Sequence, residues 1–130
     1  MIYVDTSVVL AQLLAEDQKP PPDLWTQALV SSRLLEYETW TRIHARQLVA
    51  SHGEAVRQLL AQVSLLELSP LVLARALEPF PTAVRMLDAM HLASVEFLRH
   101  RRPDLELATY DRRLGPAARS LGIRLVDLRT

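Results

Sequence analysis

Five short apolar segments recur along the chain, and longer segments with helical spacing of apolar residues separate them. The short segments cover residues 2–4, 29–30, 65–68, 105–108 and 123–126. Each precedes a polar or helix-starting residue such as Ser, Thr or Asp, types that favour helix N-termini. Short buried runs of this kind are typical of parallel strands, both faces of which are covered. The pattern predicts a three-layer α/β/α sandwich with a central, mostly parallel sheet of about five strands.

The intervening segments predict helices. They cover residues 8–14, ending near the prolines at 20–22, then a short helix at 23–28, then 34–49, 54–63, a helix opened by Pro70, a helix from the cap Thr82 to about His100, and 113–121 with Gly122 as C-cap. No internal repeat or low-complexity segment interrupts them. Residues 1–130 are therefore expected to form a single domain.

Composition narrows the class of protein. Apolar residues make up 49% of the 130 residues, which is enough for a hydrophobic core. No uninterrupted apolar segment of about 18 residues is present, so we expect no transmembrane helix. The first residues lack a basic region and Asp5 interrupts their apolar run, which argues against a signal peptide. The absence of cysteine excludes disulfides, thiolate zinc sites and thiol catalysis. A cytoplasmic protein is the simplest expectation.

The net charge is zero, with 15 basic and 15 acidic residues. A protein that coats nucleic acid without regard to sequence is normally basic. Nucleic acid, if it is a partner, would therefore be bound locally.

Acidic residues supply the candidate chemistry. Asp5 directly follows the first apolar segment, and Asp88 lies in an apolar helical stretch, where an unpaired carboxylate would be costly to bury. Asp111 follows the fourth segment, and Glu36 and Glu38 follow the second. Ligands of open α/β sheets bind beyond the carboxyl ends of the strands, where strand order reverses. If the first and fourth strands are neighbours, these acids converge on one crevice.

Converging carboxylates repel each other, and a hard divalent cation relieves that repulsion. Mg²⁺ and Mn²⁺ prefer oxygen ligands, and Mg²⁺ also accepts phosphate oxygens of a substrate. Such a site suits phosphodiester hydrolysis.

Structural roles compete with this interpretation. Asp5 and Asp111 are each plausible helix caps, and Asp88 is a candidate for a hydrogen bond to a nearby Ser or Arg. Glu36 and Glu38 face different sides of a helix, so only one can point inward, and spacing does not choose between them. His91 is either a ligand or proton shuttle, or a hydrogen-bonding structural residue.

Four motifs in order along the chain resemble those of the PIN domain family. The length and single-domain form of the chain resemble those of the VapC-type toxins within this family. The motifs are Ile2-Tyr3-Val4-Asp5-Thr6-Ser7, Ser32-Arg33-Leu34-Leu35-Glu36-Tyr37-Glu38, Asp88-Ala89-Met90-His91-Leu92-Ala93 and Ala108-Thr109-Tyr110-Asp111-Arg112-Arg113-Leu114.

The resemblance implies an Mg²⁺- or Mn²⁺-dependent endoribonuclease, the toxin of a type II toxin–antitoxin pair. Its catalytic acids would be Asp5, Glu38, Asp88 and Asp111, the register of the second motif selecting Glu38 over Glu36. Asp5 and Asp88 would be the main metal ligands, completed by Glu38 and Asp111 directly or through water. Small polar residues at Thr6 and Thr109 would assist. The partners would be RNA, a small VapB-like antitoxin and a second copy of the chain.

A further hypothesis concerns the antitoxin surface. Apolar side chains in the N-terminal helical segments could leave a groove for an antitoxin helix, or could be buried in the core; they are Leu10, Leu13, Leu14, Trp25 and Trp40.

Other classes fit the sequence less well. A phosphorylated receiver domain needs adjacent acids after the first strand and a late lysine, whereas Thr6 follows Asp5 and Lys19 is the only lysine. A dinucleotide-binding fold needs a glycine-rich turn, and the three glycines are too far apart. A dehalogenase-like phosphatase needs an acid at position 7, which is Ser. The remaining rival is a catalytically weak module that keeps the fold and only binds a partner.

Overall fold

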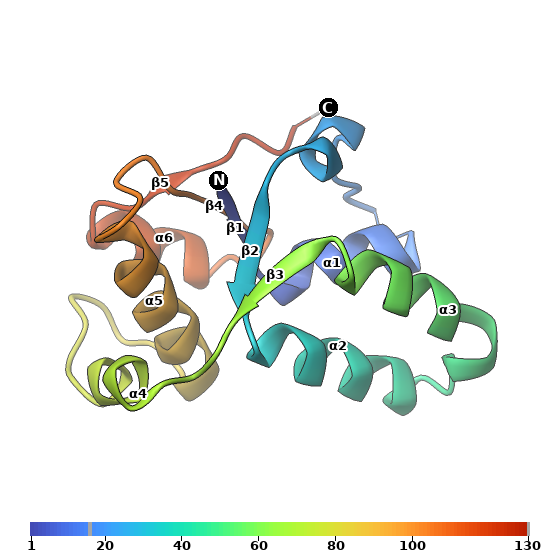
Figure 1. Ribbon diagram of the computed structural model, residues 1–130, viewed down its shortest axis with the longest axis horizontal. Coiled ribbons are helices and arrows are strands. Elements are labelled where there is room, and N and C mark those ends of the chain that lie inside the picture. Colours follow the sequence, from blue (N-terminus) through green and yellow to red (C-terminus); the bar gives the residue numbers. More distant parts are fainter. Residues whose placement is uncertain (16, 130) are drawn as a thin grey trace.

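The computed structural model describes residues 1–15 and 17–129, and its centre is a five-stranded parallel sheet (Figure 1). The strands are β1 (Ile2–Val4), β2 (Leu29–Ser32), β3 (Val63–Leu66), β4 (Glu106–Ala108) and β5 (Arg124–Leu125). Their order is β3-β2-β1-β4-β5, and every neighbouring pair is parallel. The strand order therefore reverses at β1, and β4 lies beside it. This confirms the predicted sheet and places the ends of β1 and β4 together.

Helices cover both faces of the sheet, as the sandwich prediction requires. They are α1 (Thr6–Leu14), the 3₁₀ helix η1 (Pro22–Thr26), α2 (Leu34–Ala45), α3 (Val49–Leu60), α4 (Pro70–Ala76), α5 (Met86–Arg99) and α6 (Leu114–Ser120). Within the described ranges, no helix is long and apolar enough to cross a membrane.

Alternation along β1 divides the core in two. Ile2 and Val4 pack in a cluster with side chains of α1, α2 and α3. Tyr3 points to the opposite face and packs with side chains of α5 and α6. Successive strand residues face opposite sides of a sheet, so a three-residue strand contributes to both layers.

The predicted helix at 34–49 is wrong in its extent, because the chain forms two helices there. α2 ends at Ala45, and Gln47 adopts a left-handed backbone with φ of 56° before α3 begins at Val49. Neither Gly nor Pro marks this reversal, so it could not be predicted from local composition. α3 consequently begins five residues before the predicted start at residue 54 and packs against α2.

Two later boundaries also differ from the prediction. β3 covers 63–66 instead of 65–68, because Val63 enters the core while Glu67 is exposed. α5 begins at Met86, and Thr82 is exposed and caps no helix. Phe80 and Val84 of the preceding non-helical segment pack against the core.

Gly122 behaves as predicted at the end of α6. Its φ is +75°, and its N–H donates to the carbonyl of Arg119 at 2.9 Å. A left-handed residue just after a helix is the position that glycine favours.

Candidate active site

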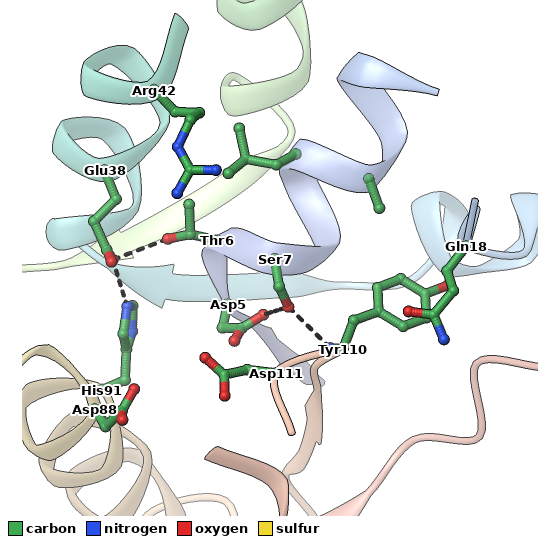
Figure 2. Close-up of a pocket in the computed structure, with 12 residues that line it drawn as sticks. Asp5, Thr6, Ser7, Gln18, Glu38, Arg42, Asp88, His91, Tyr110 and Asp111 are labelled. Carbon is green, nitrogen blue, oxygen red and sulfur yellow. Dashed lines mark hydrogen bonds and ion pairs between the residues drawn. The ribbon is translucent and has the colours of Figure 1, made fainter. Parts of the chain in front are cut away.

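A pocket of about 340 Å³ opens beyond the carboxyl ends of β1 and β4 (Figure 2). All four predicted acids line it, and they come from separate parts of the chain. Its lining residues are Asp5, Thr6, Ser7, Leu10, Ala11, Gln18, Glu38, Arg42, Asp88, His91, Tyr110 and Asp111. Glu36 is not among them.

Asp5 is buried at the point where β1 ends and α1 begins, with 4% of its surface exposed. It occupies the N-cap position of α1, but its side chain makes no capping hydrogen bond. Instead, Ser7 Oγ donates to Asp5 Oδ1 at 2.6 Å and Thr109 Oγ1 donates to Oδ2 at 2.7 Å. The alternative role of Asp5 as a side-chain cap is therefore wrong.

Burial raises the pKa of Asp5 above its usual range, and the hydrogen bonds from Ser7 and Thr109 only partly oppose that rise. Burial also raises the pKa of Asp88, and repulsion from the nearby Asp111 carboxylate adds to it. Two acids of the pocket thus lack full compensation of their negative charge. A bound cation would supply it.

Asp111 binds backbone groups at the start of helix α6 as well as lining the pocket. Its Oδ1 accepts hydrogen bonds from the backbone N–H groups of Arg113 at 2.8 Å and Leu114 at 3.1 Å. The backbone N–H of Asp111 donates to Thr109 Oγ1 at 2.9 Å. The same threonine hydroxyl thereby links Asp5 and Asp111, while the bonds to the backbone N–H groups occupy one oxygen of Asp111.

Glu38 is held from two other elements. Thr6 Oγ1, in the first turn of α1, donates to Glu38 Oε1 at 2.9 Å. The Nε2 atom of His91, in α5, lies 2.7 Å from the same oxygen. Glu36 points elsewhere and pairs with Arg33 at 3.2 Å. The structure therefore places Glu38 in the pocket and Glu36 outside it.

The donor chemistry of the pocket fits a hard divalent cation, since its acidic groups are four carboxylates. Across the described parts of the chain, no three acidic or histidine side chains already converge closely enough to hold an ion.

Three lining residues were not identified from the sequence. Arg42 lies one helical turn after Glu38 on α2, a spacing that places both on one helix face. Gln18 and Tyr110 complete the opposite wall (Figure 2). The i, i+4 relation of Glu38 and Arg42 was the one available indication.

The five apolar side chains of the predicted antitoxin groove differ in burial. Leu10 is buried, so that part of the hypothesis is wrong. Leu13 and Trp25 are partly buried against the core, and Trp25 Nε1 donates to Gln12 at 3.1 Å. Trp40 is also partly buried and lies beside Arg57 of α3.

Comparison with known proteins adds independent information. A model of the PIN domain family matches residues 2–119. Ribonuclease VapC35 of Mycobacterium tuberculosis is 30% identical over 132 residues, covering 97% of this chain and 96% of the relative. Ribonuclease VapC47 of the same species is 32% identical over 129 residues, covering 94% and 93%.

Solved structures show the same fold. The crystal structure of Mycobacterium tuberculosis VapC20, described as a toxin that cleaves the sarcin–ricin loop, has a TM-score of 0.68 at 19% identity and covers 100% of both chains. A toxin–antitoxin complex from Klebsiella pneumoniae has a TM-score of 0.60 at 16% identity, covering 99% of this chain and 98% of the other.

Proposed function

Because this chain belongs to the PIN domain family, we propose that it is a toxin endoribonuclease that hydrolyses RNA phosphodiester bonds at its acidic pocket. The observation that carries the proposal is the placement of Asp5, Glu38, Asp88 and Asp111 around one pocket. Similarity to VapC ribonucleases over nearly the whole chain supports the reaction and the toxin role.

The proposal includes a requirement for Mg²⁺ or Mn²⁺. Asp5 and Asp88 would be the main ligands, and Glu38 and Asp111 would complete the site directly or through water. When bound, such an ion supplies activation of water and charge stabilisation at the scissile phosphate. The raised pKa values of Asp5 and Asp88 support this assignment, because their carboxylates need a counter-charge.

The protein's own groups would fix the acids and bind the substrate. The Ser7 and Thr109 hydroxyls hold both oxygens of Asp5. Thr6 and His91 hold one oxygen of Glu38. The guanidinium of Arg42, a cation on the wall of an otherwise acidic pocket, would contact an RNA phosphate.

Two protein partners belong to the proposal. A small VapB-like antitoxin would neutralise the toxin, and the fold shared with a toxin–antitoxin complex supports that partner. A second copy of the chain would cover apolar side chains on α4, in the α4–α5 connection and at the start of α5. Leu71, Leu77 and Met86 are 68%, 89% and 69% exposed there. This surface lies at the end of the molecule opposite α3 (Figure 1).

The test is cleavage of total cellular RNA by the purified chain with Mn²⁺ and with a chelator. Wild type is expected to cleave only with the metal, and Asp5→Asn and Asp88→Asn are expected to lose the activity. Loss of a metal ligand should reduce the cleavage rate by more than the factor of about 10 to 100 that is typical when a residue that only supports a ligand is replaced. Asp104→Asn, an exposed acid outside the pocket, is the matched control.

Undiminished cleavage by both pocket variants would refute the mechanism. RNA binding without cleavage by wild type would instead favour the rival interpretation, a catalytically weak binding module.

A further inference from the structure

We propose that His91 is a positioning residue for Glu38, held by the Tyr3 hydroxyl as the neutral Nε2–H tautomer. The Nε2–H group then fixes one oxygen of Glu38 and leaves the other available to the pocket. The inference rests on the proposed function, because it assigns a role to Glu38 in the acidic site. The residues concerned are Tyr3, His91 and Glu38, which form a hydrogen-bond network from the core to that site.

This hydrogen-bond network begins at Tyr3, in the middle of β1. This side chain is fully buried, and its hydroxyl lies 2.7 Å from His91 Nδ1. The two rings meet edge to face, with centroids 5.8 Å apart and planes at 84°. Burial raises the pKa of Tyr3 far above its usual range, so the phenol keeps its proton and can donate it.

The two contacts of His91 determine which nitrogen carries the proton. A neutral imidazole has one donor and one acceptor nitrogen. When Tyr3 donates to Nδ1, Nε2 must carry the hydrogen, and Nε2 lies 2.7 Å from Glu38 Oε1. A carboxylate accepts such a bond and cannot donate one. Both neighbours therefore select the same tautomer.

Glu38 links this hydrogen-bond network to the pocket. Its Oε1 also accepts from Thr6 at 2.9 Å, so side chains of α1 and α5 fix a glutamate of α2 (Figure 2). Within the described residues, Oε2 has no hydrogen-bond partner. The side chain of Glu38 is 24% exposed, whereas that of His91 is 4% exposed. The buried histidine thus acts on the acid that substrate or metal can reach.

Nuclear magnetic resonance tests the tautomer without reference to activity. The chain, with ¹⁵N-labelled histidine, is studied by two-bond ¹H–¹⁵N correlation near neutral pH and without metal. His91→Gln identifies the His91 signals among those of the four histidines. We expect protonated Nε2 and hydrogen-bonded, unprotonated Nδ1. Protonation at Nδ1, alone or with Nε2, would overturn the proposal.

Variants test the positioning role through Mn²⁺ affinity, measured by calorimetric titration. Gln at position 91 extends an N–H to roughly the place of Nε2, whereas Asn reaches only the place of Nδ1. We expect His91→Asn to weaken Mn²⁺ binding about 10-fold or more and His91→Gln to restore most of it. His100→Gln, an exposed histidine that follows α5, is the control.

Tyr3→Phe keeps the ring and removes only the donor to Nδ1. The Nδ1 resonance of His91 should shift as that hydrogen bond is lost, and Mn²⁺ affinity should fall. Unchanged Nδ1 resonance and affinity in this variant would overturn the role of Tyr3. Equal affinity of folded His91→Asn and wild type would overturn the role of His91.

Failure of the proposed function has a different outcome. In that case wild type neither binds Mn²⁺ nor cleaves RNA, while the tautomer measurement still shows whether Tyr3 and Glu38 determine the proton position of His91.

Discussion

Thr109 donates a hydrogen bond of 2.7 Å to Asp5 from 104 residues away in the sequence. The bond joins the end of β4 to the end of β1, which pair directly. The same hydroxyl accepts the backbone N–H of Asp111 at 2.9 Å. One threonine, which is not itself an acid of the pocket, therefore fixes Asp5 and Asp111 relative to each other.

Replacing Thr109 by Val should destabilise the protein and weaken metal binding. A hydrogen bond to a charged group contributes about 1.5–3 kcal/mol, and its loss leaves the buried Asp5 carboxylate with one donor fewer. Urea unfolding and Mn²⁺ titration measure the two effects. Thr82→Val, at an exposed threonine, is the control. Wild-type stability and affinity in Thr109→Val would show that this bond contributes nothing.

The stability of the metal-free protein should depend on Asp5 in a specific direction. Its folded pKa is raised above 3.8, so the folded state binds more protons than the unfolded state between these two values. The stability contributed by protonated Asp5 is complete below 3.8 and is lost as the pH rises through the folded pKa. Asp5→Asn should therefore gain stability relative to wild type as the pH rises.

Urea unfolding of both chains in chelator, across that interval, measures the difference. Saturating Mn²⁺ should abolish the advantage of the variant, since the metal binds deprotonated carboxylates. A stability difference that is independent of pH would contradict the raised pKa.

Glu36→Gln and Glu38→Gln form a matched pair: the same substitution at two glutamates that lie two residues apart on α2. Glu38→Gln should reduce RNA cleavage at least about 10-fold, because it changes an acid of the pocket. Glu36→Gln removes an ion pair with Arg33 whose side chains are about one-third exposed, so it should leave activity unchanged and cost at most about 1 kcal/mol. Cleavage assays and thermal unfolding measure both. The reverse ranking would assign the active glutamate to Glu36.

Arg42→Gln should weaken RNA binding without changing Mn²⁺ affinity. The guanidinium lines the pocket beside the acids, where a phosphate of the substrate would pass. The slope of log affinity against log salt should fall by about 0.7 for one lost phosphate contact with single-stranded RNA. Arg46→Gln, just after α2, is the control. A normal slope in Arg42→Gln would remove Arg42 from the RNA-binding surface.

Leu77→Glu should convert a dimer to a monomer in light scattering. Leu77 directly follows α4 and is 89% exposed in the proposed dimer surface, and a buried charge at an interface is costly. Val49→Glu, on α3 at the far end of the molecule, should leave the dimer intact. A dimer that persists in Leu77→Glu would place the interface elsewhere.

The sequence predicted the sheet well because its central strands β1 and β2 are buried on both faces and helices separate the strands along the chain. It failed where local composition gave no indication, as at Gln47, whose left-handed backbone divides α2 from α3. The predicted bounds of edge strand β3 were two residues too late along the chain, because its most apolar residues are not its most buried ones. Boundaries of this kind depend on packing between distant residues.

For the candidate site, the sequence predicted the four acids and, through the family resemblance, Thr6 and Thr109 beside them, but it did not predict the contribution of Tyr3 or Arg42. Asp5 and Asp88 were conspicuous because carboxylates are unusual in apolar segments. Tyr3 resembled an ordinary core residue of the first strand, and nothing nearby in sequence pointed to its bond with His91. Arg42 was equally inconspicuous. Supporting residues become visible only when elements far apart in the chain are brought together.

The position of β4 next to β1 has a consequence for how this protein is made. Asp5 emerges from the ribosome before Thr109 and Asp111, and β4 can dock on β1 only after β4 itself has emerged. A growing chain, or one cut short by a premature stop codon before position 111, carries an incomplete pocket. Synthesis of this ribonuclease would thus remain harmless to the cell until the segment that carries Asp111 had been translated.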